Sequence, residues 1–173
     1  MKSKQTKTKH IAFVGIAATL ALLLSYVEFL LPPLFAAVPG IKIGLPNVVI
    51  LFMLYRAGFR YAALISFIRL SISSLLFGNA MTLVYSTAGA LLSLLIMGIL
   101  KKTDKFSAVG VSVAGGVMHN LGQVLVAMLL LDTPQIAYYM IVLAFTGTIS
   151  GIFVGLTGAH LIKRMPGNST LGF

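Results

Sequence analysis

Long apolar runs, almost free of charged residues, constrain what this chain can fold into more than any other feature. Hydrophobic residues make up 58% of its 173 residues and charged residues only 9%, whereas a water-soluble domain carries about 25% charged residues. A run of roughly 20 apolar residues is the length that crosses a bilayer as a helix. The pattern therefore predicts an all-α integral membrane protein.

Six such runs lie between short polar connections. We expect membrane-spanning helices over residues 11–31, 45–55, 61–77, 81–100, 109–131 and 134–161. The second run is short for a span unless it begins in the loop around Ile43. The sixth is long, and its glycines allow a bend or the close approach of a neighbouring helix.

The lysine and arginine residues predict the orientation of these helices. With six spans, eleven of the thirteen basic residues fall on one side, and only Lys42 and Arg69 lie elsewhere. Loops rich in basic residues stay in the cytoplasm. We therefore expect a basic cytoplasmic N-terminus over 1–10, one membrane domain over 11–162 and a short cytoplasmic tail over 163–173, in a multi-pass protein of a bacterial plasma membrane. The basic clusters are then topology signals, and no nucleic-acid partner is expected.

The beginning of the chain also resembles a signal peptide, because a basic stretch precedes an apolar run. The run is long, however, and it contains Glu28. The sequence FAAVP that follows it, at residues 35–39, is a poor cleavage site. We expect an uncleaved first helix.

Two charged residues fall inside the expected spans. Glu28 lies in the outer third of the first helix, and Arg69 lies near the middle of the third. A charge in hydrocarbon is costly, so both side chains should face the protein interior or a cavity. Two interpretations stay open: an ion pair that joins the two helices, or contact with a ligand.

The fifth helix carries three polar side chains on one broad face, within the sequence GGVMHNLGQ at residues 115–123. His119 and Gln123 are four residues apart, and Asn120 and Gln123 are three apart. Hydrogen bonding between helices would explain them, but their concentration beside glycines favours the wall of a binding site. A single histidine without cysteine or carboxylate neighbours does not favour a metal site, and no cofactor is expected.

The outer ends of two other helices carry polar residues and tyrosines. Asn79, Tyr85 and Ser86 fall in the outer half of the fourth helix. Tyr138 and Tyr139 begin the sixth helix, where tyrosines typically form an aromatic belt at the membrane surface. We expect Asn79 and Tyr85 near the ligand, and the tyrosines of the sixth helix at the belt.

Several motifs together resemble a known family, the Gx transporter family, which often carries the label heptaprenyl diphosphate synthase component I. These motifs are PGIKIGLPN at 39–47, Arg69, FGN at 77–79, YSTAGALLSLL at 85–95 and HNLGQ at 119–123. They cover nearly the whole chain. The family's architecture is similar to that of the S-components, the substrate-binding membrane subunits of energy-coupling factor (ECF) transporters.

This resemblance implies a fold and a site. S-components have six helices with cytoplasmic termini, a substrate pocket in the outer half, and an alanine-xxx-alanine face on the first helix that meets an energy-coupling transmembrane subunit. Ala17 and Ala21 match that face, and the spacing of small residues lets another helix approach closely. One departure is Pro46, which stands where the family is expected to have alanine.

The loop VPGIKIGLPNVV, residues 38–49, is external by topology and is the lid over the pocket by resemblance. Its prolines and glycines restrict or bend the backbone. Lys42 is the only cation on the outer face, placed to attract an anionic ligand. Asn47 begins the second helix, where its side chain either caps the helix or contacts the ligand. A rigid turn without a ligand is the alternative.

Three functions fit these observations. The favoured one is a non-enzymatic substrate-binding subunit for a small or amphipathic ligand, negatively charged given Arg69 and Lys42 against Glu28 alone. It is powered by partner ATPases, because no G-x-x-x-x-G-K-S/T motif occurs in the chain. The second is a non-catalytic accessory protein of prenyl diphosphate or menaquinone metabolism, since the two aspartates are too isolated for catalysis. The third is a quinone- or flavin-linked electron-transfer protein. The expected substrate-binding residues are Lys42, Asn47, Arg69, Asn79, Tyr85, His119, Asn120 and Gln123.

Overall fold

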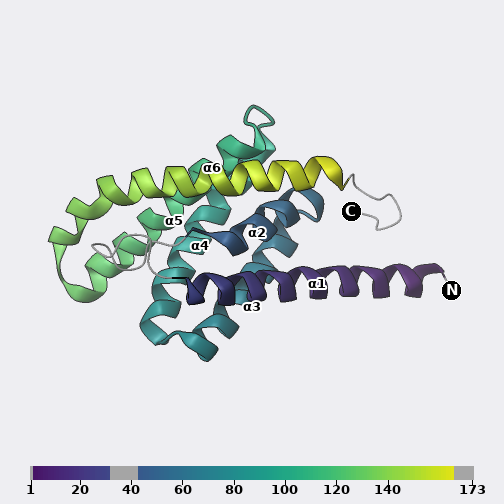
Figure 1. Cartoon of the computed structure of the whole chain (residues 1–173), viewed down its shortest axis with the longest axis horizontal. Coiled ribbons are helices and arrows are strands. Elements are labelled where there is room, and N and C mark those ends of the chain that lie inside the picture. Colours follow the sequence, from purple (N-terminus) through teal and green to yellow (C-terminus); the bar gives the residue numbers. More distant parts are fainter. Residues whose placement is uncertain (1, 32–42, 166–173) are drawn as a thin grey trace.

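Six α-helices and one short 3₁₀ helix make up residues 2–31 and 43–165, the part of the chain that the computed structural model describes (Figure 1). In chain order they are α1 (Lys2–Leu30), α2 (Leu45–Arg56), α3 (Phe59–Phe77), α4 (Ala80–Lys102), α5 (Ala108–Leu131), η1 (Pro134–Tyr139) and α6 (Met140–Arg164). All six predicted helices are present, close to their predicted bounds. The main difference is that α1 begins at Lys2, so the basic N-terminal residues continue the helix.

Five of these helices are long and apolar enough to cross a membrane, and the apolar stretch of α1 begins at Thr8. Helix α2 is the exception. Its 12 residues extend about 18 Å, well short of the roughly 30 Å of a bilayer's hydrocarbon core. The chain is thus an all-α membrane protein with five full-length candidate spans and one helix of about half that length.

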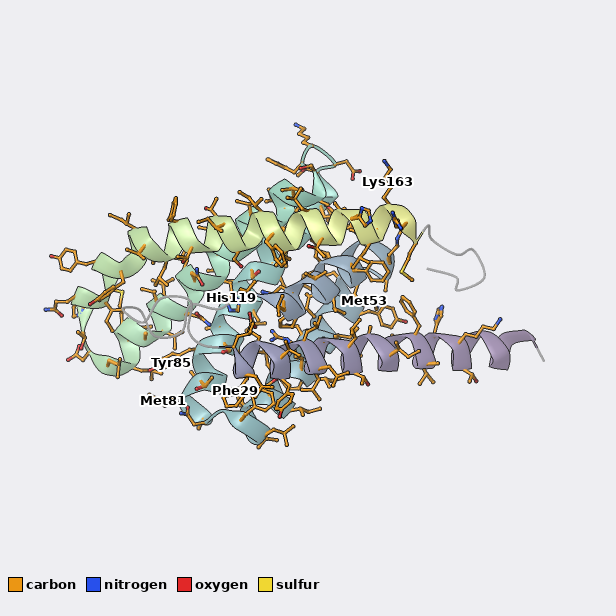
Figure 2. The ribbon with its side chains drawn as sticks, in the orientation of Figure 1. Phe29, Met53, Met81, Tyr85, His119 and Lys163 are labelled. Carbon is orange, nitrogen blue, oxygen red and sulfur yellow. The ribbon has the colours of Figure 1, made fainter. Side chains whose placement is uncertain are left out.

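Helix α2 lies in the middle of the bundle, where it packs against α1, α3 and α6. Its side chains form the centre of the apolar core, and Leu51, Met53 and Leu54 are almost fully buried. Met53 is labelled on this helix in Figure 2. Residues from α1, α3, α4, α5 and α6 complete this core: Ala17, Ala21, Ala62, Ile65, Leu94, Met97, Val111 and Val154. An apolar helix that is surrounded by other helices can be short, because it need not reach both membrane surfaces.

Glycines bring α4, α5 and α6 into contact along their backbones. A side-chain Cβ atom at Gly151 of α6 would lie 2.6 Å from the Cα atom of Val113 on α5. One at Gly89 of α4 would lie 2.6 Å from the backbone oxygen of His119. Small residues at such positions let membrane helices pack closely. The glycines of the sixth predicted span therefore serve close packing.

Basic side chains close one end of the bundle by binding the last carbonyl groups of two helices. Lys101 Nζ donates a hydrogen bond to the backbone oxygen of Leu54 at 2.6 Å and lies 5.3 Å from the centre of the Tyr55 ring. The Arg56 guanidinium donates to the backbone oxygen of Ile162. Cations near a helix C-terminus satisfy its free carbonyls and oppose its dipole. We call this region, where α2, α4 and α6 end, the basic end.

Helix α1 begins and helix α6 ends at the basic end (Figure 1). Lys163 points outward there (Figure 2). This arrangement agrees with the predicted clustering of basic residues on one side. That this side faces the cytoplasm stays a prediction.

The start of α2 explains how the chain accommodates Pro46. Gly44 precedes the helix with a φ angle of 82°, a left-handed conformation that glycine adopts without strain. Pro46 then occupies the first turn, where a helix amide has no partner within the helix and the missing N–H of proline costs nothing. Proline instead of the expected alanine is therefore compatible with an unbroken helix.

Candidate functional site

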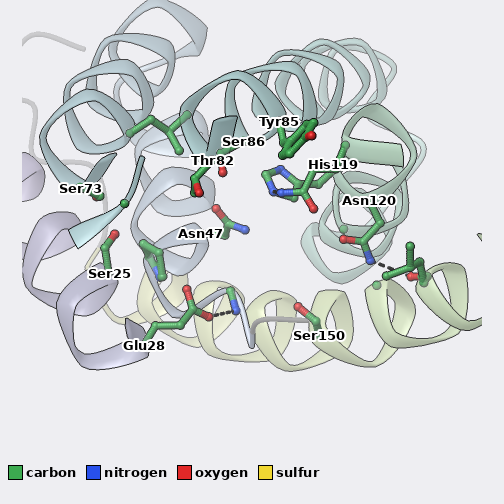
Figure 3. Close-up of a pocket in the computed structure, with 18 of the residues that line it drawn as sticks. Ser25, Glu28, Asn47, Ser73, Thr82, Tyr85, Ser86, His119, Asn120 and Ser150 are labelled. Atoms are coloured by element: carbon green, nitrogen blue, oxygen red, sulfur yellow. Dashed lines mark hydrogen bonds between the residues drawn. The ribbon is translucent and has the colours of Figure 1, made fainter. Parts of the chain in front are cut away.

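A cavity of about 570 Å³ occupies the half of the bundle opposite the basic end (Figure 3). Its wall comes from the last turns of α1 and α3, the first turns of α2, α4 and α6, the second half of α5, and η1. Because the helices alternate in direction, these segments all lie at one end. The short α2 begins at the floor of the cavity and fills only the space between the cavity and the basic end.

Six of the eight predicted substrate-binding residues line this cavity: Asn47, Arg69, Tyr85, His119, Asn120 and Gln123. These six side chains therefore share one space, and their contact with a ligand stays a prediction. Asn79 does not line the cavity. Lys42 lies outside the described residues, as does the first part of the loop, residues 38–42.

Asn79 has a local structural role instead. Its Oδ1 atom accepts hydrogen bonds from the backbone N–H of Thr82 at 2.8 Å and from the Thr82 hydroxyl at 3.0 Å. This is the capping arrangement that asparagine favours before the first turn of a helix. The expectation that Asn79 contacts ligand is therefore not supported by its position, and the residue that reaches the cavity is Thr82.

The polar face of α5 both bonds to a neighbouring helix and lines the cavity. Asn120 Nδ2 donates a hydrogen bond to the backbone oxygen of Leu143 on α6 at 2.7 Å, so it joins two helices while lining the cavity. His119 Nε2 and Gln123 Nε2 lie 3.2 Å apart and hydrogen-bond along the same helix. Figure 3 shows both His119 and Tyr85 at the cavity. These contacts fix the orientation of the polar side chains.

Glu28 and Arg69 do not form the ion pair that was one of the two interpretations. The Glu28 carboxylate accepts hydrogen bonds from the backbone N–H groups of Gly44 and, at 3.3 Å, of Leu45 (Figure 3). Arg69 Nη1 instead donates to the Ser25 hydroxyl at 3.3 Å. Both charged residues line the cavity, but each has a partner of its own.

Hydroxyl groups supply much of the polar wall, and sequence reasoning missed most of them. The missed residues are Ser25, Ser73, Ser74, Thr82, Thr146 and Ser150. Serine and threonine are easily overlooked in apolar helices because they often bond to their own backbone. A usable signal was spacing: Ser25 lies three residues before Glu28, and Ser73 lies four residues after Arg69, which places each beside a charge.

Tyr139 also lines the cavity, whereas the sequence placed it in an aromatic belt with Tyr138. Tyr138 is strongly exposed, as a belt residue should be. The two tyrosines are adjacent in η1 and therefore point in different directions.

Ala17 and Ala21 do not form an outward docking face. Their exposed fractions are 7% and 0%, and both belong to the core around α2. The close approach that small residues permit is thus used inside this chain. The second small pair of α1, Gly15 and Thr19, is the one exposed at the surface.

No three metal-binding side chains come together within the described residues. The cavity offers one carboxylate, one guanidinium, an imidazole, amides and hydroxyl groups, together with apolar surface from Phe29, Phe77 and Leu143. Such a wall can bind a molecule that has both polar and apolar parts.

Comparison with known proteins adds a family. The model of the family described as heptaprenyl diphosphate synthase component I matches residues 17–161. No match is found among curated proteins or among solved structures. The matched region includes the core, all of the glycine contacts between α4, α5 and α6, and every residue that lines the cavity. The chain therefore belongs to the heptaprenyl diphosphate synthase component I family.

Proposed function

We propose that this protein is a substrate-binding membrane subunit, similar in role to the S-components of ECF transporters. It captures a small or amphipathic ligand at the outer face for uptake driven by a partner ATPase. The observation that carries the proposal is the polar cavity at the end opposite the basic residues. Its volume of about 570 Å³ lies in the range of about 300–1,000 Å³ that is typical of small-molecule sites.

The position of the cavity supports capture from outside. If the basic end faces the cytoplasm, the cavity lies in the outer half of the membrane, and the core around α2 closes the path to the inner side. A bundle of this kind binds its ligand but needs a partner to move it. On α1, the exposed small residues Gly15 and Thr19 are a better candidate contact with an energy-coupling subunit than the buried Ala17 and Ala21.

A second function is favoured by the family description itself. The protein could act as a non-catalytic accessory component in prenyl diphosphate metabolism and hold the apolar chain of a product. Phe29, Phe77 and Leu143 give the cavity wall apolar surface for such a chain. The two functions differ in their ligand and in their partner.

Native mass spectrometry of the gently purified protein separates the two functions. A small ligand together with a co-purified ATPase module supports the subunit of a transporter. A bound prenyl product together with a soluble synthase component supports the accessory role. Recovery of the protein with neither ligand nor partner in every preparation would contradict both.

The cavity can be tested with two glutamines in different places. Gln123 lines the cavity, whereas Gln135 in η1 is exposed and lies outside it. Loss of one hydrogen bond to a ligand costs on the order of 1–3 kcal/mol, which corresponds to about 5- to 150-fold in affinity. We expect Gln123→Ala to weaken retention of the co-purifying ligand by that factor, and Gln135→Ala to leave it unchanged. Equal retention in both variants would place the ligand elsewhere.

A further inference from the structure

The two opposite charges that line the cavity are compensated to very different degrees. Glu28 and Arg69 are the carboxylate and the guanidinium of the wall. A charge inside a membrane protein needs a counter-charge or dense hydrogen bonding to be stable. The partners of each group therefore indicate which charge is left for a ligand.

Glu28 has its compensation within the chain. Its carboxylate accepts two backbone N–H groups, those of Gly44 and Leu45, at the start of α2. The first N–H groups of a helix are free donors, and the helix dipole places partial positive charge there. The negative charge of Glu28 is thus used to bind the end of α2.

Arg69 has no acidic group in direct contact with its guanidinium, and the Glu28 carboxylate reaches it only through space. The exposed fraction of Arg69 is only 8%, and among the described residues its side chain makes one hydrogen bond, from Nη1 to the neutral Ser25 hydroxyl at 3.3 Å. The Nε atom is buried and has no hydrogen-bond partner within the described residues. A guanidinium carries five N–H donors in a planar fork, so most of its binding capacity is unused.

The chain holds no other acidic side chain that can neutralise Arg69. Glu28, Asp104 and Asp132 are its only acidic residues. Asp104 follows α4 at the basic end, and the exposed Asp132 caps the end of α5. Glu28 acts on Arg69 through space without contacting it, so an anion in direct contact with the guanidinium must come from outside the chain.

We infer, on the basis of the proposed binding function, that the ligand carries an anionic group, a carboxylate or a phosphate, which binds against Arg69 in this cavity. The planar fork of arginine matches both groups with two parallel hydrogen bonds. The neutral parts of the ligand have donors and acceptors in the Asn47 amide, the Tyr85 hydroxyl and the Ser86 hydroxyl. These three side chains line the cavity and make no hydrogen bond to other described residues.

The same argument predicts that substitution of Arg69 stabilises the ligand-free protein, whereas most substitutions of buried residues destabilise a protein. A buried guanidinium without an acidic group in contact with it destabilises the empty state, and the shorter, neutral side chain of glutamine removes the buried charge. We expect Arg69→Gln to raise the thermal unfolding temperature of ligand-free protein. An arginine with a purely structural role would give the opposite result, a lower unfolding temperature.

The binding experiment uses four probes with the same six-carbon chain: hexyl phosphate, hexanoate, hexanol and hexylammonium. They are added to protein in nanodiscs of phosphatidylcholine, and thermal stabilisation and calorimetry report binding. The two anions should bind at least tenfold more tightly than the alcohol and the ammonium. Arg69→Gln should weaken anion binding about 10- to 150-fold, and Arg69→Lys should retain part of it.

Arg60→Gln is the matched control, because Arg60 lies on the same helix but is exposed near the basic end. It should bind the anions as the wild type does. Nanodiscs that contain phosphatidylglycerol form a separate arm: retention of this lipid in native mass spectra, and its loss in Arg69→Gln, would identify a lipid headgroup as the anion instead of a soluble molecule.

The outcomes distinguish this inference from the proposed function. A co-purifying ligand or probe that is neutral or cationic would overturn the anion but leave the binding function intact. Equal anion binding by wild type and Arg69→Gln would also overturn the inference of an anionic ligand at Arg69. A lower unfolding temperature of ligand-free Arg69→Gln would overturn it too. Neither result would contradict the binding function. If no probe binds and nothing co-purifies, the proposed function fails and the inference fails with it.

Discussion

The two ends of this helix bundle are built from the same helices and yet differ in what fills them. At the basic end, side chains of α2 fill the centre, and Lys101 and Arg56 bind the last carbonyls of neighbouring helices. At the opposite end, the same ring of helices surrounds a polar cavity. The difference arises from the length of α2, since a helix of about 18 Å fills only part of the bilayer thickness.

This comparison indicates that the apolar core and the polar cavity occupy different depths of the bundle. Leu51, Met53 and Leu54 at the filled end make apolar contacts and leave no space for a ligand. Asn47 and Tyr85 at the hollow end have unused hydrogen-bonding groups, which contribute little to folding. Substitutions at the two ends should therefore have different signatures, and each of the following predictions tests that separation.

The largest expected effect is an all-or-none difference in labelling. The chain contains no cysteine, so single cysteines report cleanly. Asp132 at the hollow end and Lys102 at the basic end are both exposed. In intact cells a membrane-impermeant maleimide should label Asp132→Cys and not Lys102→Cys, and permeabilised cells should allow both. The reverse pattern would turn the cavity to the cytoplasm and contradict uptake from outside.

The next effect is loss of folding stability at the filled end. Leu51 is fully buried, and its Cδ2 atom lies 2.7 Å from the position that a Cβ atom at Gly158 would take. We expect Leu51→Ala to lower the free energy of unfolding by about 2–5 kcal/mol, because deletion of buried methyl groups leaves a cavity. The measurement is denaturant unfolding in detergent. Leu129→Ala is the control, since Leu129 is 81% exposed and should change stability little.

Ligand affinity makes the Leu51 experiment sharper. The folded fraction of Leu51→Ala should bind the ligand as the wild type does, because Leu51 does not line the cavity. A large loss of affinity in that fraction would show that the two ends are coupled.

A smaller effect is expected where α5 meets α6. The Cβ atom of Gly151→Ala would lie 2.6 Å from Val113 Cα and 2.9 Å from the Ser112 backbone oxygen, so the helices must separate. Overpacking of this kind costs about 1–3 kcal/mol. The separation should also weaken ligand binding, because the hydrogen bond from Asn120 to α6 requires α5 and α6 to stay close together. Gly15→Ala, with nothing within 4 Å, should cause neither change. Normal affinity in Gly151→Ala would mean that this helix contact does not position the cavity wall.

Local properties of the sequence were enough to predict the class of protein, the helices and the basic end. Helix bounds follow from runs of apolar residues, which a chain in a bilayer must bury in lipid or protein. The wall of polar side chains at His119, Asn120 and Gln123 could also be predicted, because side chains three and four residues apart share a helix face.

What the sequence by itself could not determine is which way each helix turns and which partner each polar group finds. Ala17 and Ala21 could face a partner protein or the core, Glu28 could bind Arg69 or the start of α2, and Asn79 could reach the ligand or cap its own helix. These choices depend on the rotation of each helix about its axis and on the positions of neighbouring backbones. In lipid, apolar surface is satisfied on every face, so hydrophobicity gives no preferred direction. Only tertiary packing, where glycines and serines allow backbones to meet, decided them and left the guanidinium of Arg69 without an acidic group in contact with it.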